Sequence, residues 1–277
     1  MLNAAGLYGN LPIMFSEYLR SWNLTTDGSA VMTPTSVLLP VLWGDVPAML
    51  KVAVLDEEKL GNQLMVWWNG GGAARVLKHA EGVILMERAE TGISLADLVR
   101  EGRDDEASRI ICMILRRLHV QRVYPPPALP PLITWFEPLG RVAEAQGGIL
   151  RAAAETASHL LSTQHDVVVL HGDMHHGNVL RFRSRGWLAI DPKGLIGEPG
   201  FDYANMFCNP DDQMATMPGR LAREVKVVAE AADLESNRLL SWILAWAGLS
   251  AAFSLEDHQP CATALKIAEL AAGELNT

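Results

Sequence analysis

Residues 170–193 decide the fold: they read Leu-His-Gly-Asp-Met-His-His-Gly-Asn-Val-Leu from 170 to 180 and Leu-Ala-Ile-Asp-Pro-Lys from 188 to 193. The apolar run 167–170 has the length and the β-branched content of a buried strand. A loop of polar and glycine residues follows, and short strands are expected again at 179–182 and 187–190. The pattern predicts polar side chains that loops present on a rigid β scaffold.

Three polar residues of this stretch suit phosphoryl transfer, which needs alignment and charge neutralisation more than covalent help from the protein. Asp173 would accept or orient the proton of an attacking hydroxyl. Asn178 lies five residues later and Asp191 eighteen residues later. Both offer oxygen atoms, the ligands that Mg²⁺ prefers, and they would hold the metal against nucleotide phosphates.

A metal-dependent hydrolase is a rival interpretation. His171, His175 and His176 could ligate zinc or iron together with Asp173. That site would need a further cluster of ligands, and the other histidines are scattered singly along the chain. The kinase interpretation is therefore favoured, with His171 as a structural residue that braces the loop.

The same residues carry a family resemblance. His171-Gly172-Asp173-x-x-x-x-Asn178 followed by Ile190-Asp191-Pro192 resembles the catalytic loop and metal-binding segment of the aminoglycoside phosphotransferases, relatives of protein kinases. With 185–187, 191–195 and 197–198 included, the stretch is similar to the streptomycin 6-kinase and hydroxyurea-resistance kinase branch. This resemblance implies an α+β, protein-kinase-like fold of two lobes. A small sheet-bearing nucleotide-binding lobe would span 1–88, and a mostly helical catalytic and substrate-binding lobe 89–277.

Composition limits the partners. The chain has 277 residues, of which 49% are hydrophobic and 20% charged, so it is globular and large enough for a sizeable core. The net charge of −9 argues against nucleic acid as a partner. It fits a cationic small molecule, and equally an ordinary soluble surface.

Location and cysteine chemistry are also constrained. The cysteines at 112, 208 and 261 have apolar neighbours and no CxxC spacing, which predicts reduced thiols in a cytoplasmic protein. No targeting segment is evident, since the first basic residue is Arg20. The uncharged run 239–255 is shorter than a membrane span and is expected to be a buried helix. No membrane partner is predicted, and the oligomeric state stays open.

The N-terminal third predicts a helix at 13–22 and strands at 30–32, 36–43 and 48–54, the last two joined by a turn at 44–47. Lys51 interrupts the apolar strand 49–54. A buried lysine needs a partner, and nucleotide phosphates would supply one. The residue resembles the phosphate-binding lysine of kinases. A lysine on the solvated face of an edge strand is the alternative.

Two features depart from the kinase pattern. No Gly-x-Gly-x-x-Gly loop is present, and Thr35 and Ser36 stand where such a loop would touch the phosphates. In the expected helix 56–68, the position of the glutamate that pairs with the lysine falls at Gly61. Glu58, one turn earlier, is the expected substitute. The alternative is that Glu58 is a solvent-facing acid in the first turn.

Strands are expected at 74–79 and 83–86, followed by a hinge at 87–89. The family order implies that backbone groups of Glu87 and Ala89 meet the adenine edge there. The rest of the chain is predicted to be mainly helical. Segments are expected at 95–100, from Asp104 as N-cap to 119, at 134–145, 148–164, from 200, and near 219–232, 234–253 and 258–274.

Acidic and polar groups near the cleft are the candidates for binding a polycation with many hydroxyls. They are Asp202, Asn205, Asp211 and Glu256, together with Asp212 and Asp257. Each is alternatively an ordinary surface or capping residue.

The resemblance implies transfer of the γ-phosphoryl group of ATP, with Mg²⁺, to the 6-hydroxyl of streptomycin, a cationic antibiotic, giving resistance. A kinase of another small alcohol or amine, a metal-dependent hydrolase and a non-catalytic kinase-like binding protein remain as alternatives. The filled positions Asp173, Asn178 and Asp191 argue against the last of these.

Overall fold

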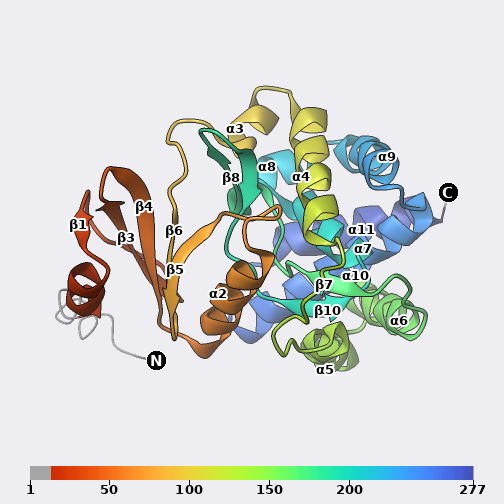
Figure 1. Ribbon diagram of the computed structural model, residues 1–277. Helices are drawn as coiled ribbons and strands as arrows, with labels where there is room; N and C mark the ends of the chain where they lie inside the picture. The colour runs from red at the N-terminus through yellow and green to blue at the C-terminus, as the bar shows by residue number, and fades with distance from the viewer. Residues whose placement is uncertain (1–13, 277) are drawn as a thin grey trace.

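A computed structural model describes residues 14–276, which fold into an antiparallel sheet followed by a mainly helical part (Figure 1). The sheet has the strand order β1-β3-β4-β6-β5, and β2 pairs with β3. Its strands are β1 (Leu24–Thr26), β2 (Val31–Met32), β3 (Ser36–Trp43), β4 (Val46–Ala53), β5 (Val76–Ala80) and β6 (Val83–Glu87). β1 was not expected, because its two exposed threonines hide the strand pattern.

Alternation of side chains gives the sheet two different faces. On one face, apolar residues of β3, β4 and β6 form a small core with Phe15 from a helix at 14–21. The expected helix began at residue 13, which lies outside the described residues. Lys51 has the opposite parity from Leu50 and Val52 in β4, so it points to the other face, toward the helical part. The solvated-lysine alternative is wrong, because Lys51 is only 4% exposed.

Helix α2 (Asp56–Trp68) lies between the sheet and the helical part (Figure 1). It ends at Asn69, whose left-handed backbone stops the helix. A Cβ at Gly61 would come closer than 3.0 Å to the carbonyl oxygen of Pro192. This position therefore has to be glycine, which explains why the expected glutamate cannot stand there.

The helical part begins after β6. Its elements are α3 (Leu95–Arg100), α4 (Asp104–Leu118), η1 (Leu132–Phe136), α5 (Glu137–Gln146), α6 (Gly148–Ser162), α7 (Gly200–Ala204), η3 (Asn205–Cys208), α8 (Asp212–Ala215), α9 (Arg220–Ala232), α10 (Ser236–Glu256) and α11 (Ala262–Leu275). The long helices match the expected segments apart from their ends. The expected N-cap role of Asp104 is wrong: the cap position is Arg103, and the buried Asp104 carboxylate binds Arg220 of α9 at 2.7 Å.

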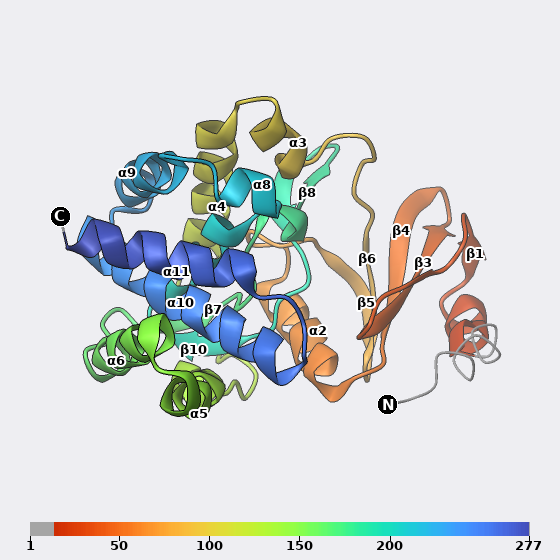
Figure 2. The same cartoon turned by 180° about the vertical axis from the view of Figure 1, so that it is seen from behind.

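Helix α10 is the centre of the large core and packs against α6, α7 and α11 (Figure 2). By length and composition alone it could cross a membrane, but 61% of its most apolar window is buried inside the protein. The packing therefore accounts for its apolar composition. Cys112, Cys208 and Cys261 are free, and burial raises the pKa of the Cys112 thiol to about 12, so it stays protonated.

Short strands carry the polar loop. β8 (Val179–Phe182) and β9 (Gly186–Ala189) form a hairpin, and β7 (Val168–Leu170) pairs with β10 (Leu195–Gly197). β10 was not expected, because three residues are too few for a pattern. Ala74 N–H donates to the carbonyl of Ala189 at 2.9 Å, and Ala189 N–H donates to the carbonyl of Gly72 at 3.0 Å. The segment between α2 and β5 is thus joined to the strands that frame the loop.

The close approach at Gly61 gives a stability prediction. We expect Gly61→Ala to destabilise the protein by about 1–3 kcal/mol, because the added methyl meets backbone that cannot move aside. Gly140→Ala in α5 is the matched control: its methyl meets no atom within 4 Å. That change should leave stability equal or raise it by about 0.5–1 kcal/mol. Urea unfolding of both variants checks this, and equal effects would contradict the packing argument.

Candidate active site

The carboxylate of Asp173 is held by two amides in the loop after β7. Asn178 Nδ2 donates to the backbone carbonyl of Asp173 at 2.8 Å and lies 3.3 Å from its Oδ2. Asn205 Nδ2 donates to Oδ1 at 2.8 Å, and the Asn205 carbonyl oxygen accepts from Asn209 at 3.0 Å. Asn205 is only 4% exposed. It therefore orients the carboxylate rather than facing a substrate, which corrects its expected role in substrate binding.

The buried side chain of His171 holds the loop in place by hydrogen bonds. His171 accepts from Asp173 N–H at Nδ1 (3.2 Å), so its Nε2–H donates to the carbonyl of Ile190 (2.8 Å). Burial lowers the pKa of His171, which keeps the ring neutral. Its two ring nitrogens are thereby occupied.

The expectation that Asp202 contacts a substrate is corrected by its burial. Its carboxylate accepts from the backbone N–H groups of His171 and Gly172, both at 2.8 Å, and lies 2.9 Å from His119 Nε2. The side chain is 0% exposed, out of reach of any ligand. Asp202 instead anchors the loop to α7.

The histidines do not converge on a metal. Among residues 14–276, no group of three or more His, Cys, Asp or Glu side chains is arranged to hold one. His175 Nδ1 accepts from Gly177 N–H at 3.1 Å, and His176 is buried with a pKa lowered to about 3, chiefly by its burial. This geometry gives the hydrolase interpretation no ligand set.

Lys51, Glu58 and Asp191 meet where the sheet faces the loop. Lys51 Nζ lies 2.6 Å from Glu58 Oε2 and also contacts the Asp191 carboxylate. Glu58 is 1% exposed, so it is not the solvent-facing acid of the alternative interpretation. Asp191 has a left-handed backbone (φ 61°) and a half-exposed side chain (42%). Non-glycine residues rarely adopt this conformation, which ends the extended backbone that follows β9.

Asn178 and Asp191 form a donor set that fits Mg²⁺. Asn178 uses its amide nitrogen on Asp173, so its carbonyl oxygen remains as a ligand. Asp191 adds a carboxylate that solvent and phosphates can reach. Oxygen donors of this kind suit a hard cation that keeps several waters and bridges to phosphates.

Thr35 and Ser36 were expected to touch the nucleotide phosphates, but Ser36 is buried against Glu58. Ser36 is 1% exposed, and its hydroxyl donates to Glu58 Oε2 at 3.1 Å. The carbonyl of Thr35 accepts from Val54 N–H at 2.8 Å, which closes the turn before β3. Ser36 therefore supports Glu58 instead of touching phosphates directly, and only the half-buried Thr35 keeps a side chain near the surface.

The expected hinge at 87–89 begins at Glu87, the last residue of β6, and continues into the connection to α3. The Glu87 carboxylate accepts from Arg75 N–H at 2.6 Å and contacts the Arg185 guanidinium, while the Glu87 N–H donates to the carbonyl of Arg75 at 3.0 Å. The Glu87 side chain is thus engaged by the neighbouring strands. Ala89, half-buried, follows two residues later in the connection.

A cavity of about 310 Å³ opens beside Asp173. Its walls come from the loop, the segment after Asp191, η1, the second half of α10 and the residues that follow α10; they include Gly172, Lys193, Trp135, Trp246, Leu249, Ser250, Phe253, Ser254, Asp257 and Gln259. Three aromatic residues, Lys193 and the acid Asp257 line the same space as Asp173. This mixture suits an amphipathic cation with hydroxyl groups.

Two expected substrate residues do not line this cavity. Glu256 forms an ion pair with Arg141 at 2.9 Å, and its neighbour Asp257 is the residue in the cavity wall. Asp211 caps α8 by accepting from Met214 N–H at 3.0 Å and pairs with Arg100. The capping bond lowers the pKa of Asp211. Sequence alone does not tell which of residues 256 and 257 faces the cavity, because it does not show at which residue α10 ends.

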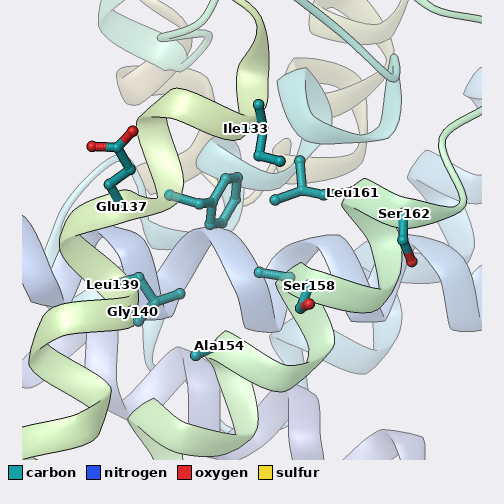
Figure 3. A pocket seen from close by; sticks show the side chains of 10 residues that line it. Ile133, Glu137, Leu139, Gly140, Ala154, Ser158, Leu161 and Ser162 are labelled. Atoms are coloured by element: carbon teal, nitrogen blue, oxygen red, sulfur yellow. The ribbon is translucent and has the colours of Figure 1, made fainter.

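Another cavity, of about 380 Å³, lies between η1, α5 and α6 (Figure 3). Its walls are mainly apolar, with Ile133, Leu139 and Leu161 among them, and it includes no residue of the loop. Asp173, Lys51 and Asp191 are not among its lining residues, so the cavity that Asp173 lines is the candidate acceptor site.

Comparison with known proteins agrees with this geometry. Residues 21–258 match the family model described as "Aminoglycoside/hydroxyurea antibiotic resistance kinase". The chain belongs to this family. It is 50% identical over 244 residues to a streptomycin 3''-kinase of Klebsiella pneumoniae, a match that covers 86% of this chain and 91% of that one. It is 31% identical to a hydroxyurea phosphotransferase of Kitasatospora aureofaciens (96% and 78% covered) and 30% identical to a streptomycin 6-kinase of Streptomyces griseus (89% and 84%).

Solved structures confirm the expected kinase-like fold of the chain. An ethanolamine kinase of Plasmodium vivax superposes with a TM-score of 0.65 at 14% identity, covering 98% of this chain and 89% of that one. An aminoglycoside phosphotransferase in ternary complex with AMP-PNP and hygromycin B gives 0.63 at 14% identity, covering 94% and 96%. The enzyme is a phosphotransferase that acts on an alcohol group, as expected.

Sequence reasoning missed several cavity residues of the kinase. Trp135, Trp246 and Phe253 look like any core aromatic in a helical pattern, and only the tertiary packing turns them toward Asp173. Lys193 could have been identified from the sequence, since it directly follows Asp191-Pro192 of the metal-binding motif.

The pairing of Glu58 gives a pH prediction. Burial opposes ionisation, but Lys51 and Lys193 outweigh it and hold the pKa of Glu58 at about 2, below its ordinary 4.5. A carboxylate with a lowered pKa in the folded state adds stability above pH 4.5, which is lost as the pH falls toward 2. We expect Glu58→Gln to be less stable at pH 7 by on the order of 3 kcal/mol, a gap that narrows steadily below pH 4.5.

Urea unfolding at pH 7, 5, 4 and 3 measures that gap. Glu57→Gln is the matched control: its side chain is 58% exposed and lies 3.6 Å from Lys193, so it should have little effect at any pH. A gap for Glu58→Gln that stays constant over this range would show that its charge does not stabilise the fold.

Proposed function

We propose that the enzyme uses Mg²⁺ and ATP to phosphorylate a hydroxyl group of streptomycin, and that this reaction gives resistance in the cytoplasm. One observation carries the proposal: Asp173, whose carboxylate is oriented by Asn205, lines a cavity together with three aromatic residues, Lys193 and the acid Asp257. The names of the relatives supply the substrate class, since a streptomycin kinase is 50% identical over 86% of this chain.

Each polar group has a part in the mechanism. Asp173 takes the proton of the acceptor hydroxyl, while Asn205 and Asn178 keep its oxygens turned toward the cavity. Lys51 holds nucleotide phosphates, and Glu58 fixes its ammonium group. Asn178 and Asp191 would hold Mg²⁺, which neutralises phosphate charge when bound.

The nucleotide enters from the sheet side. We assign the lobe boundary to the hinge at 87–89, with the backbone of Glu87 and Ala89 at the adenine edge. Thr35 is the remaining candidate at the phosphate end, because Ser36 is occupied by Glu58.

The acceptor occupies the cavity beside Asp173. Trp135, Trp246 and Phe253 offer ring faces to cationic groups, and Asp257 offers a carboxylate. An aminoglycoside has both cationic groups and hydroxyls, so one end can be held while a hydroxyl reaches Asp173.

The 3''-hydroxyl is the proposed acceptor atom. The 3''-kinase relative is 50% identical, whereas the 6-kinase relative is 30% identical, so position 3'' has more support than the 6-hydroxyl expected from the sequence. The hydroxyurea phosphotransferase relative, at 31%, makes hydroxyurea the second acceptor to be tested.

The deciding experiment is ADP release with Mg²⁺-ATP and a panel of streptomycin, other aminoglycosides and hydroxyurea. We expect release that depends on streptomycin and a product phosphorylated at position 3'', identified by NMR. Asp173→Ala should lower turnover by about 10²–10⁴-fold while leaving nucleotide binding largely intact. Release only with hydroxyurea or another alcohol would keep the kinase and refute the streptomycin assignment. Turnover of Asp173→Ala at the wild-type rate would remove Asp173 from its role.

Neighbouring acids test the acceptor cavity. Asp257→Asn should raise the KM for the cationic acceptor about tenfold, because a single ionic contact to the substrate is lost, with the KM for ATP unchanged. Glu256→Gln is the matched control, since that side chain pairs with Arg141 outside the cavity. Steady-state kinetics measures both. Equal changes in the two variants would place the acceptor elsewhere.

A further inference from the structure

One buried carboxylate holds two ammonium groups, one on each oxygen. Lys51 Nζ lies 2.6 Å from Glu58 Oε2, and Lys193 Nζ lies 2.9 Å from Glu58 Oε1. Glu58 is 1% exposed, and Ser36 also donates to Oε2 at 3.1 Å, so its position is firmly set. The Glu58 carboxylate therefore fixes the positions of both ammonium groups.

With Mg²⁺-ATP bound, Lys51, Lys193 and Glu58 together would present one net positive charge to the proposed phosphate site. A single buried carboxylate balances only one of the two lysines. Asp191 contacts Lys51 here, but it is the proposed metal ligand and its charge serves the metal once Mg²⁺-ATP is bound. Glu57 lies 3.6 Å from Lys193 and is 58% exposed, so water screens most of its effect.

The two lysines approach from different sides. Lys51 comes from β4 of the sheet, and its side chain is 6% exposed. Lys193 follows the metal-binding segment, lines the acceptor cavity together with Gly172 and Asp173, and is 22% exposed. A Cβ on Gly172 would lie 3.1 Å from the Lys193 Cβ, so the lysine starts directly beside the catalytic loop.

We propose that Lys193 is a catalytic residue that contacts the γ-phosphoryl group from the acceptor side during its transfer. The inference rests on the proposed phosphoryl transfer, but not on the identity of the acceptor. Lys51 would hold the nucleotide from one side of the phosphates, and Lys193 would meet the moving phosphoryl group from the other.

The chemistry needs such a charge. The acceptor oxygen forms a bond to the γ-phosphorus, and the bond from phosphorus to the bridging oxygen breaks with its electron pair passing to ADP. The hydroxyl proton goes to Asp173. The outer oxygens of the phosphoryl group stay negatively charged throughout. The Lys193 ammonium group donates a hydrogen bond to one of them, gives up no proton, and stabilises the group between donor and acceptor.

A purely structural role is the rival explanation, because Lys193 also joins the segment after Asp191 to α2 through Glu58. If Lys193 only fixed Glu58, its loss would disturb Lys51 and weaken nucleotide binding as the loss of Glu58 does. If Lys193 contacts the transferred group, its loss would leave the affinity for Mg²⁺-ATP unchanged and would weaken only the binding of the transition state.

Titration calorimetry measures the affinity for Mg²⁺-ATP, and the affinity for Mg²⁺-ADP with and without tetrafluoroaluminate, a planar mimic of the transferred phosphoryl group. Wild-type enzyme, Lys193→Met, Lys193→Arg and Glu58→Gln are measured alongside Lys266→Met, an exposed lysine of α11 that pairs with Glu269. We expect the affinity of Lys193→Met for Mg²⁺-ATP to stay within about threefold of the wild type. The gain in Mg²⁺-ADP affinity caused by tetrafluoroaluminate should be at least about tenfold smaller than in the wild type. Turnover should fall about 10²-fold. Lys193→Arg should recover part of both, and Lys266→Met should match the wild type.

Several results would overturn the inference. One is equal weakening of Mg²⁺-ATP binding in Lys193→Met and Glu58→Gln, with no further loss for the mimic. Another is a tetrafluoroaluminate-dependent gain in Mg²⁺-ADP affinity in Lys193→Met that equals the gain in the wild type. A third is the absence of any such gain in the wild type. The binding measurements need no acceptor, so they decide the role of Lys193 even if streptomycin proves not to be the substrate.

Discussion

The carboxylate of Glu58 is the point on which the rest of the site depends. It is buried, and a charge in that position is stable only if it is paired and hydrogen-bonded. Lys51, Lys193 and Ser36 supply those partners from β4, from the segment after Asp191 and from the start of β3. One side chain of α2 thereby ties the sheet to the catalytic region, and Gly61 on the same helix allows the close approach that makes this contact possible.

The catalytic loop has a comparable anchor of its own. Asp202 accepts two backbone N–H groups of the loop from beneath, and His171 joins the loop to the strand end at Ile190. Both side chains are buried, so the loop is held by groups that never meet a substrate. Asn205 then orients the carboxylate of Asp173. Polar residues near a catalytic loop thus divide into those that face the cavity and those that hold it, and burial separates the two sets.

Much of this enzyme could be predicted from local sequence. The β3–β4 hairpin, α2, the long helices and the loop with Asp173, Asn178 and Asp191 follow from apolar periodicity and from motif spacing. The substitution of Glu58 for the expected glutamate also followed, because one turn of helix keeps a residue on the same face. β1 and β10 were not predicted, because the two exposed threonines of β1 hide its strand pattern and β10 has only three residues. Asp202, Ser36 and Glu256 were placed in binding roles because polar residues near a motif look alike whether buried, capping or exposed.

The sequence by itself determined the family, the kinase-like fold and the order of catalytic residues, because these are set by residue types at fixed separations along the chain. Only the tertiary structure decided which acids face the acceptor cavity, that Lys193 shares Glu58 with Lys51, and that aromatic rings from η1 and α10 stand beside Asp173. Those features join residues that are distant in the chain, 135 positions apart for Lys193 and Glu58. Their contacts depend on how helices pack, and the spacing of residues along one element contains no information about that packing.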